Sequence, residues 1–345
     1  MLYWIRRRKR KMNFMSEFNF KLGFKSIFFS LVVLSSFLIL AFVLSLMCGA
    51  ARVKWGTPEG AFILMHIRLP RTILALLVGM ALSVAGAVFQ ALLRNPLADP
   101  HLLGVSAGGA LGVVIGSGFF LAGSLSFSIP TFSFLGSLLA IFVVYRLSLR
   151  KGSLSLYTLL LIGVMLNSFF VSTIVFLQFL VRSDELLTVL FWLLGNLSLV
   201  GYWRLLFVAV LVFVGMVPLF FQARKLNILS LGESSAHTLG VPVEQTKKAM
   251  FFLAALLTGT AVSVSGMIGF IGLVVPHLAR IFFGSDYRKL LPVSALLGGA
   301  VLVLSDSLAR TIISPQELPV GVITSFFGAP VFVYFLKQRE AKRVI

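Results

Sequence analysis

The chain has 345 residues, of which 59% are hydrophobic and 12% charged, and its mean hydropathy is +1.02. A soluble domain does not need so apolar a composition, so these values favour a membrane protein with several spans. The net charge of +19 raises nucleic acid as a partner, which the distribution of the basic residues then argues against. The single cysteine, Cys48, excludes a disulfide framework within the chain and a cysteine-based metal site.

Hydrophobic runs separated by turn signals predict an all-α, polytopic membrane protein with about ten transmembrane helices. The predicted spans are 27–48, 68–93, 104–122, 128–146, 155–181, 203–222, 247–266, 270–283, 290–309 and 320–336. The apolar piece at 186–199 is shorter than a span requires and is interpreted as re-entrant or interfacial. Residues 1–26 form a basic N-terminal segment, and residues 27–345 form the transmembrane domain.

The basic residues divide unequally between the two sides of this topology. Of the 30 Lys and Arg, 23 fall on the side that holds both termini and 7 on the other. The positive-inside rule therefore places the N- and C-termini in the cytoplasm of a cell (inner) membrane protein. The basic excess is explained by topology and by contact with anionic lipid, so no nucleic-acid partner is expected.

Small residues recur every four positions in several predicted spans. Gly79, Ser83, Ala87 and Ala91 form one such series, which predicts close helix packing in lipid. A shift of 180 residues also aligns 75–104 with 255–284, and the two copies start on opposite sides of the membrane. Inverted repeats of this kind are common in transporters, although two apolar helices of biased composition are an alternative explanation.

Arginines gather on the predicted external side. Arg68 and Arg71 precede the second span, and Arg310 follows the ninth. One interpretation is interfacial snorkelling, with Asp306 and Arg310 paired at i,i+4. The other is a cationic surface that docks an acidic partner, because the planar guanidinium donates two hydrogen bonds to a carboxylate. Spacing alone does not choose between them.

The cytoplasmic segment 226–245, between the sixth and seventh spans, is too polar to cross a membrane. Its pattern predicts two short helices joined by Gly-Val-Pro at 240–242, which would form a rigid knob that contacts a partner. A plain linker is the alternative. In the later stretch 266–292, Pro276 is expected to interrupt a short helix. His277 and Arg280 there are interpreted as structural polar contacts, since no carboxylate or cysteine stands at metal-ligand spacing.

Several catalytic features are missing from the sequence. The chain has no phosphate-binding loop, and all eleven acidic residues fall at termini, loops or predicted helix ends. A buried acidic series for a proton or sodium relay is therefore not expected. We expect a transporter rather than an enzyme, with no cofactor and no metal site, and with an external source of energy.

Five strings make a family resemblance specific. They are RLPR (68–71), ALSVAGAVFQALLRNPLADPHLLGVSAGGALG (81–112), LGESSAHTLGV (231–241), GFIGLVVPHLAR (269–280) and ELPVGVITSFFGAPVF (317–332). With them the chain resembles the FecCD family, the permease subunits of bacterial ABC importers for iron–siderophores, haem and cobalamin. The resemblance covers nearly everything after about residue 27.

The resemblance implies type II ABC importer permease architecture, in a homodimer or a pair with a close paralogue. Two ABC ATPase subunits would dock in the cytoplasm, and a periplasmic or lipid-anchored substrate-binding protein would dock outside at Arg68, Arg71 and Arg310. The cytoplasmic gate is assigned to Asn95 and Leu97. The residues implied to couple to the ATPases are Leu231, Gly232, Glu233, Ser234, Ala236, His237, Leu239, Gly240 and Val241.

The translocation path is assigned to the fifth span, where Asn167, Ser168, Ser172 and Thr173 interrupt an apolar run. These side chains would instead serve as interhelical hydrogen-bonding groups if the span is packed. Iron(III)–siderophore is the first choice of substrate, with cobalamin and haem next. A secondary transporter that works alone is the alternative of a different class.

Overall fold

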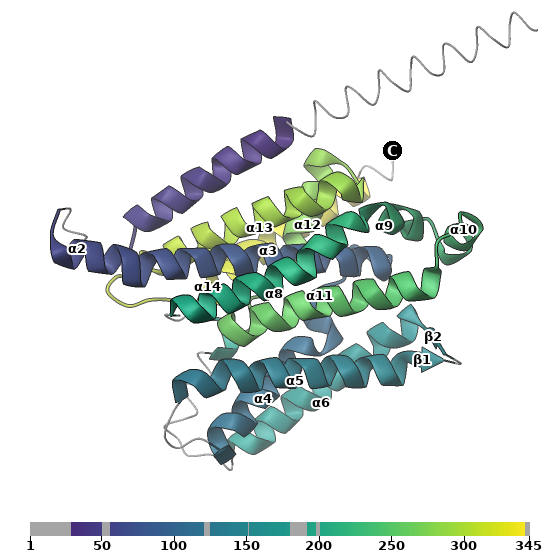
Figure 1. Cartoon of the computed structure of the whole chain (residues 1–345), viewed down its shortest axis with the longest axis horizontal. Coiled ribbons are helices and arrows are strands. Elements are labelled where there is room, and N and C mark those ends of the chain that lie inside the picture. The colour runs from purple at the N-terminus through teal and green to yellow at the C-terminus, as the bar shows by residue number, and fades with distance from the viewer. Residues whose placement is uncertain are drawn as a thin grey trace, which may run out of the picture.

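A computed structural model of the chain describes residues 29–49, 56–120, 125–150, 152–179, 192–197 and 201–341. Within these ranges the protein is a bundle of helices with one two-stranded hairpin of β1 (Leu149–Arg150) and β2 (Ser153–Leu154) (Figure 1). The predicted N-terminal segment 1–26 lies outside the described residues, as does most of the apolar piece 186–199. The all-α class is confirmed.

The first described helix spans Phe29–Met47. The helical elements that follow are α2 (Pro58–Phe62), η1 (Ile63–Arg68), α3 (Leu69–Leu92), η2 (Pro100–Leu103), α4 (Val105–Phe120), α5 (Leu125–Ser148), α6 (Leu156–Gln178), α8 (Tyr202–Phe221), α9 (Ala223–Ser230), α10 (Glu233–Thr238), α11 (Val243–Ser265), α12 (Ile271–Phe283), α13 (Tyr287–Ala309) and α14 (Val320–Ala341). Each of the ten predicted spans coincides with one of these helices.

Seven stretches of the described residues are long and apolar enough to cross a membrane. Three further apolar helical stretches, Val105–Gly116, Ile271–Phe283 and Val320–Phe335, are shorter, so ten is an approximate number of spans. The second predicted span begins earlier than expected, because Pro58–Leu92 is one continuous helical stretch of 35 residues. Thr57 starts it by accepting a hydrogen bond from the Gly60 amide, and Pro58 suits the first turn. Arg68 and Arg71 therefore lie inside a helix rather than ahead of one.

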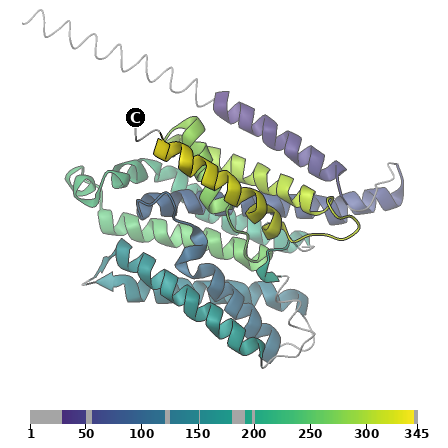
Figure 2. The same cartoon turned by 180° about the vertical axis from the view of Figure 1, so that it is seen from behind.

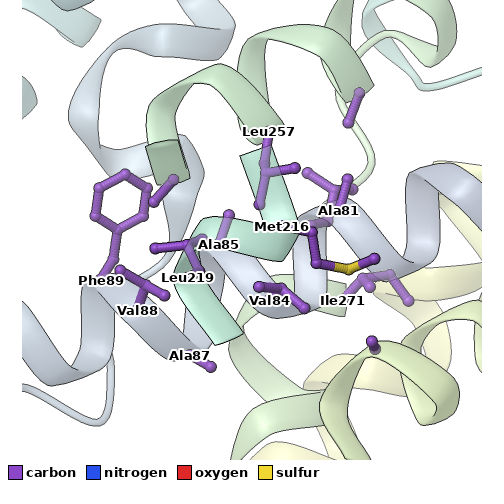
Figure 3. Packing of buried hydrophobic residues seen from close by; sticks show 14 of the residues in the cluster. Ala81, Val84, Ala85, Ala87, Val88, Phe89, Met216, Leu219, Leu257 and Ile271 are labelled. Carbon is purple, nitrogen blue, oxygen red and sulfur yellow. The ribbon is translucent and has the colours of Figure 1, made fainter. Parts of the chain in front are cut away.

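Helix α3 is the centre of the bundle, and nearly all of its residues are buried. It packs against α11, α12 and α13, while α4 and α5 pack against each other and against α11. Figure 3 shows the apolar core around α3, where Val84, Ala85 and Phe89 meet side chains from neighbouring helices such as Met216 and Leu257. Chain segments more than 150 residues apart are thus brought together around one helix.

Glycines set how closely α3 approaches its neighbours. A Cβ built on Gly79 would lie 2.3 Å from the carbonyl oxygen of Gly298, and one on Gly86 would lie 1.9 Å from that of Gly272. Real side chains do not reach such distances, so both contacts require glycine on α3. The predicted close packing of small residues is confirmed in this helix.

The break between α11 and α12 lies between the predicted spans 247–266 and 270–283, as expected, but Pro276 adds no second break. The backbone leaves α11 after Ser265 and enters α12 at Ile271, with Gly266 and Phe270 both at positive φ. Pro276 sits inside α12 without ending it. The expectation of a helix interrupted at Pro276 is therefore wrong, because the left-handed residues before Ile271 make the break.

The two ends of the bundle differ in character. One end carries α2 and the loop between α13 and α14, and the other carries α9, α10 and the β1–β2 hairpin (Figure 1). Helix α14 runs back towards the end that carries α9 and α10 (Figure 2). Large apolar side chains are exposed along α6, α8 and α14, among them Trp203, Phe213 and Phe326. Such faces suit lipid or another membrane-embedded chain.

Candidate functional site

A buried ion-pair cluster lies at the end of the bundle that carries α2. Arg71 Nε lies 3.0 Å from Asp306 Oδ1, and Arg71 Nη1 lies 2.6 Å from Glu317 Oε2. Arg310 Nε reaches Asp306 Oδ2 at 2.9 Å. One carboxylate, that of Asp306, thus serves two guanidinium groups that come from different helices. The predicted i,i+4 pair of Asp306 and Arg310 is confirmed.

Arg68 and Arg310 hold the first helix, Phe29–Met47, against the bundle. Arg68 Nη1 donates to the carbonyl oxygens of Leu46 and Met47 at 2.7 and 2.9 Å. Arg310 Nη2 donates to Ser45 Oγ at 2.8 Å. The last carbonyls of a helix have no partner within it, so these donors satisfy groups that would otherwise need water. Positive charge at this position also suits the helix dipole.

Burial changes the interpretation of Arg68, Arg71 and Arg310. Their exposed fractions are 3%, 6% and 3%, so their guanidinium groups contact groups of this chain and are not exposed to a partner. An exposed cationic surface is therefore not what these three side chains form. Glu317, whose side chain is 41% exposed, is the part of the cluster that reaches the surface. Docking of a partner at this end stays a prediction.

The segment 226–245 forms a knob at the opposite end of the bundle. Helices α9 and α10 are joined by Leu231 and Gly232, whereas Gly-Val-Pro at 240–242 joins α10 to the long helix α11. Gly-Val-Pro therefore does connect a short helix, α10, to the next helix, as predicted, but that next helix is the long α11 and not a second short one, and the other short helix, α9, precedes α10. The physical reason is that Gly232, at φ 131°, makes the earlier turn and Gly240, at φ 76°, makes the later one.

The residues assigned to coupling divide into a surface and an anchor. Leu231 and Leu239 are 71% and 61% exposed, which is unusual for leucines outside an apolar environment. Residues exposed beside them on the knob are Ser234, His237 and Gly240. Ala236 and Val241 are buried beneath the knob, and Gly232 and Glu233 are half-buried. The knob therefore presents an apolar tip on a packed base.

Two polar contacts hold this knob rigidly on the bundle. At the first, Asn227 on α9 donates from Nδ2 to Asp286 Oδ1 at 2.7 Å and accepts from the Tyr287 amide at 2.9 Å. Asp286 is also the N-cap of α13, since it accepts from the Arg288 amide. Hydrogen bonds from Arg288 and Asn227 lower the pKa of the Asp286 carboxyl to about 2, although partial burial opposes the shift.

The second contact centres on Lys247, which is only 2% exposed. Its Nζ lies 2.8 Å from the Leu154 carbonyl oxygen, 3.1 Å from Glu233 Oε2 and 2.6 Å from Glu244 Oε1. Glu244 Oε2 in turn accepts from the Leu154 amide at 2.8 Å. The β1–β2 hairpin, α10 and α11 therefore meet at one ammonium group.

Asn95 and Leu97 lie in the turn that follows α3, on the side of the bundle that carries the knob. Arg94 takes the left-handed conformation at φ 48°, and Asn95 Oδ1 accepts from the Leu97 amide at 2.9 Å. This side-chain turn fixes the backbone and leaves the Leu97 side chain 45% exposed. An exposed apolar side chain on a rigid turn fits the gate that the sequence predicts.

The predicted path residues lie on α6, of which Leu159 and Gly163 pack inward. Ser168 and Ser172 are exposed and Asn167 and Thr173 half-buried. Ser168 and Thr173 donate to carbonyl oxygens one turn back in their own helix, and among the described residues neither makes an interhelical hydrogen bond. The exposed serines share a face of α6 with large apolar side chains, among them Met165, Phe169 and Phe176.

The short helix η2, which follows the turn of Asn95 and Leu97, contacts α6. A Cβ on Gly104, at the end of η2, would lie 3.3 Å from the Gly163 carbonyl oxygen and 3.6 Å from the Asn167 amide nitrogen. A Cβ on Gly163 would meet the Leu103 Cα at 2.9 Å. The predicted path helix α6 thus contacts the segment that directly follows the predicted gate residues.

Sequence reasoning missed several contacts near the gate. His101 Nε2 donates to the Ile268 carbonyl oxygen at 2.8 Å, and Nδ1 pairs with Ser106 Oγ. Arg280 Nη1 donates to Gln90 Oε1 at 3.2 Å, which confirms a structural polar contact for this arginine. His101 and Ile268 are 167 positions apart, and Gln90 and Arg280 are 190 apart, so no spacing rule reveals these two contacts. Lys247 was recognisable only as an i,i+3 partner of Glu244.

Taken together, the bundle of long apolar helices and the short polar helices anchored at one end of it are typical of a polytopic transport protein of the permease class. Residues 24–338 match the FecCD transport family. The chain belongs to this family.

Named relatives in this family include a hemin transport permease, HmuU of Yersinia pestis, which is 43% identical over 84% of this chain and 89% of its own length. A cobalamin import permease, BtuC of Halobacterium salinarum, is 41% identical over 85% of this chain and 78% of its own. An iron(3+)-hydroxamate import permease, FhuG of Bacillus subtilis, is 36% identical over 82% and 86%.

A solved structure confirms the architecture. A chain of a metal-chelate type ABC transporter in an inward-facing conformation has a TM-score of 0.81 and 31% identity to this chain, and covers 90% of it and 99% of its own length. The protein is therefore the permease of an ABC importer with type II architecture.

Proposed function

We propose that this permease moves an iron(III)–siderophore complex across the cell inner membrane, powered by two ABC ATPase subunits and supplied by a substrate-binding protein. The observation that carries the proposal is the anchored knob of α9 and α10. Its exposed Leu231 and Leu239 offer an apolar tip, while Asn227 and Lys247 tie its base to other helices. A tip that is both apolar and rigid is suited to receive a push from a partner.

The ATPase would seat on this tip. Burying two exposed leucines on docking stabilises a contact by about 1.5–3 kcal/mol each. Ser234 and His237 flank the tip and add polar contacts, and the buried Ala236 and Val241 keep the knob folded. Movement of the knob would switch the permease between inward- and outward-facing states, because ATP-bound and ATP-free ATPases favour different states.

The translocation path is proposed to run between two copies of the chain, or between this chain and a close paralogue. The exposed face of α6 would line it, with Ser168 and Ser172 among apolar side chains. Leu97 would meet its counterpart from the second subunit and, with Asn95, narrow the cytoplasmic mouth. An exposed leucine on a fixed turn supports this assignment, since a partner would cover it.

The substrate-binding protein, periplasmic or lipid-anchored, is proposed to dock at the end that carries α2 and the cluster around Arg71. Because Arg68, Arg71 and Arg310 are buried, their part would be to hold the docking surface in shape rather than to meet the partner's carboxylates directly. The internal pair of Arg71 and Glu317 supports this assignment.

A metal complex with an organic shell is the substrate class that best fits the path. Helix α6 carries no Asp, Glu, Lys, Arg or His over Leu156–Gln178, so it offers no strong ligand to a bare cation. Relatives named for hemin, cobalamin and iron(3+)-hydroxamate all handle metal held in an organic framework. Iron(III)–siderophore is our first choice, and haem and cobalamin are the alternatives.

Both termini and the knob are proposed to lie on the cytoplasmic side of the membrane. The excess of Lys and Arg on the side that holds the termini supports this orientation. These residues would contact anionic lipid rather than nucleic acid. The chain itself is not proposed to hydrolyse ATP or to hold a cofactor.

The deciding experiment is purification of the tagged permease from its native membrane in mild detergent, followed by reconstitution in liposomes. Co-purification of an ATPase at near one-to-one stoichiometry and ATP-dependent uptake of a ferric siderophore would support the proposal. Uptake of haem or cobalamin instead would change the substrate only. Transport by the permease alone, without ATP, would replace the proposal with a stand-alone secondary transporter.

A further inference from the structure

The ammonium group of Lys247 contacts acceptors on three different elements of the bundle. An ammonium group has three N–H donors. Here the three acceptors come from three elements, namely the Leu154 carbonyl at the end of the β1–β2 hairpin, Glu233 on α10 and Glu244 on α11. A lysine that is 2% exposed pays a desolvation cost, which these acceptors offset.

The hairpin leads directly into α6. Leu154 precedes Ser155, the N-cap of α6, whose hydroxyl accepts from the Thr158 amide. The Ser155 amide also closes the hairpin by donating to the Ser148 carbonyl at 3.3 Å. A displacement of the Leu154 backbone is therefore a displacement of the first turn of α6. Helix α6 in turn contacts η2 where Gly163 meets Leu103, and η2 directly follows the turn of Asn95 and Leu97.

We propose that Lys247 is a positioning residue that joins α10, the β1–β2 hairpin and the start of α6 into one moving body. Through it, a push on the knob would reach α6, the proposed path helix, and from α6 would reach η2, which directly follows the turn of Leu97. This inference rests on the proposed function, because it presumes that an ATPase pushes the knob.

The neighbouring contacts support Lys247 as the main link between α10 and the hairpin. Glu244 on α11 also accepts a hydrogen bond from the Leu154 amide, but among the described residues it makes no hydrogen bond or ion pair with α10. Lys248 donates to the Gly152 carbonyl at 3.3 Å and is a more exposed contact at the hairpin tip. Only Lys247 donates to α10, α11 and the hairpin together among the described residues. Arginine would not reproduce three tetrahedral donors, and methionine would supply none.

The test uses the complete transporter, purified with its ATPases and binding protein and placed in liposomes. The measured quantity is the coupling ratio, the amount of substrate transported for each ATP hydrolysed. We expect Lys247→Met to lower this ratio about tenfold, within the range of ordinary allosteric coupling, while the ATPases remain bound. Lys248→Met is the matched control, and its ratio should stay within twofold of the unchanged protein.

A second variant, Glu233→Gln, keeps the inference testable if Lys247→Met does not fold. Glu233→Gln removes one charge at the α10 arm and leaves Lys247 on Glu244 and Leu154. We expect it to lower the coupling ratio a few-fold with an unchanged melting temperature, which a purely structural role would not produce. A coupling ratio in Glu233→Gln equal to that of the unchanged protein would overturn the inference. Failure of any ATPase to co-purify with the unchanged protein would instead overturn the proposed function.

Discussion

The contact between α3 and α12 gives the sharpest quantitative prediction. In Gly86→Ala, the new methyl group would stand 1.9 Å from the Gly272 carbonyl oxygen and within 2.7 Å of two more backbone atoms of Gly272. Ordinary contact begins at 3.4 Å, so the two helices must separate by about 1.5 Å. Neither partner is a flexible side chain that can turn aside.

The same separation would break a neighbouring polar contact. Gln90, one turn further along α3, donates from Nε2 to the carbonyl oxygens of Gly272 and Leu273 at 3.4 and 3.2 Å. A shift of about 1.5 Å takes both beyond hydrogen-bonding distance. Overpacking of about 1–3 kcal/mol and a lost hydrogen bond of about 1 kcal/mol together predict a loss of roughly 2–4 kcal/mol.

The assay is thermal unfolding of the detergent-purified permease, followed by intrinsic fluorescence. Gly86→Ala should melt roughly 5 °C or more below the unchanged protein. Gly269→Ala is the matched control, because a Cβ there has its nearest neighbour, Ser325 Oγ, at 3.9 Å. A Gly86→Ala melting temperature within about 1 °C of the unchanged protein, or an equal fall in Gly269→Ala, would refute the packing argument.

Three further predictions concern the charged groups and the knob. The Asp286 carboxyl has a pKa of about 2 in the folded chain against an ordinary 3.8, so its contribution to stability is complete above about pH 5 and is lost as the pH falls towards 2. The melting temperatures of the unchanged protein and Asp286→Asn should therefore differ by a constant amount from pH 8 to 5 and converge below pH 4. Arg310→Leu should destabilise the chain by about 3–5 kcal/mol, because it leaves the buried Asp306 carboxylate with one guanidinium partner. In a double-mutant cycle measured by thermal unfolding, Arg310→Leu with Asp306→Leu should lose less stability than the two single changes summed. Leu231→Asp with Leu239→Asp should abolish ATPase co-purification without lowering the melting temperature, because both side chains are exposed; retained binding would contradict the knob as the docking tip.

The arrangement of spans was predictable because lipid imposes a simple rule. A helix must be apolar over about 20 residues to cross the hydrocarbon, and all ten predicted spans correspond to helices. The start of the second span was not predictable from hydropathy, since the cap at Thr57 and the π turn at Ile63–Arg68 extend the helix past two arginines. Short polar elements follow local chemistry, which is why α10 and its Gly-Val-Pro connection were predictable, whereas α9 was not predicted.

The arginines show what sequence reasoning could not supply. Arg71 lies 235 positions from Asp306 and 246 from Glu317, so spacing gives no indication that they meet. Only the i,i+4 pair of Asp306 and Arg310 was visible along the chain. A cationic cluster at a membrane interface reads the same in sequence whether its charges face a partner or each other. Burial decides that question, and burial is a property of the packed bundle.

The fastening of the first helix has a consequence for the order in which the protein is assembled. Phe29–Met47 is an apolar stretch of which only 17% is buried inside the bundle, so packing alone holds it loosely. Its anchors at the α2 end are Arg68 and Arg310, and Arg310 is made 265 residues after Ser45, to which it donates. During synthesis the first helix is therefore made well before Arg310, one of the two residues that hold it against the bundle. The Arg68 contacts become available almost at once, whereas the Arg310 contacts become available only after nearly the whole chain has been made, so the attachment of the first helix is completed late.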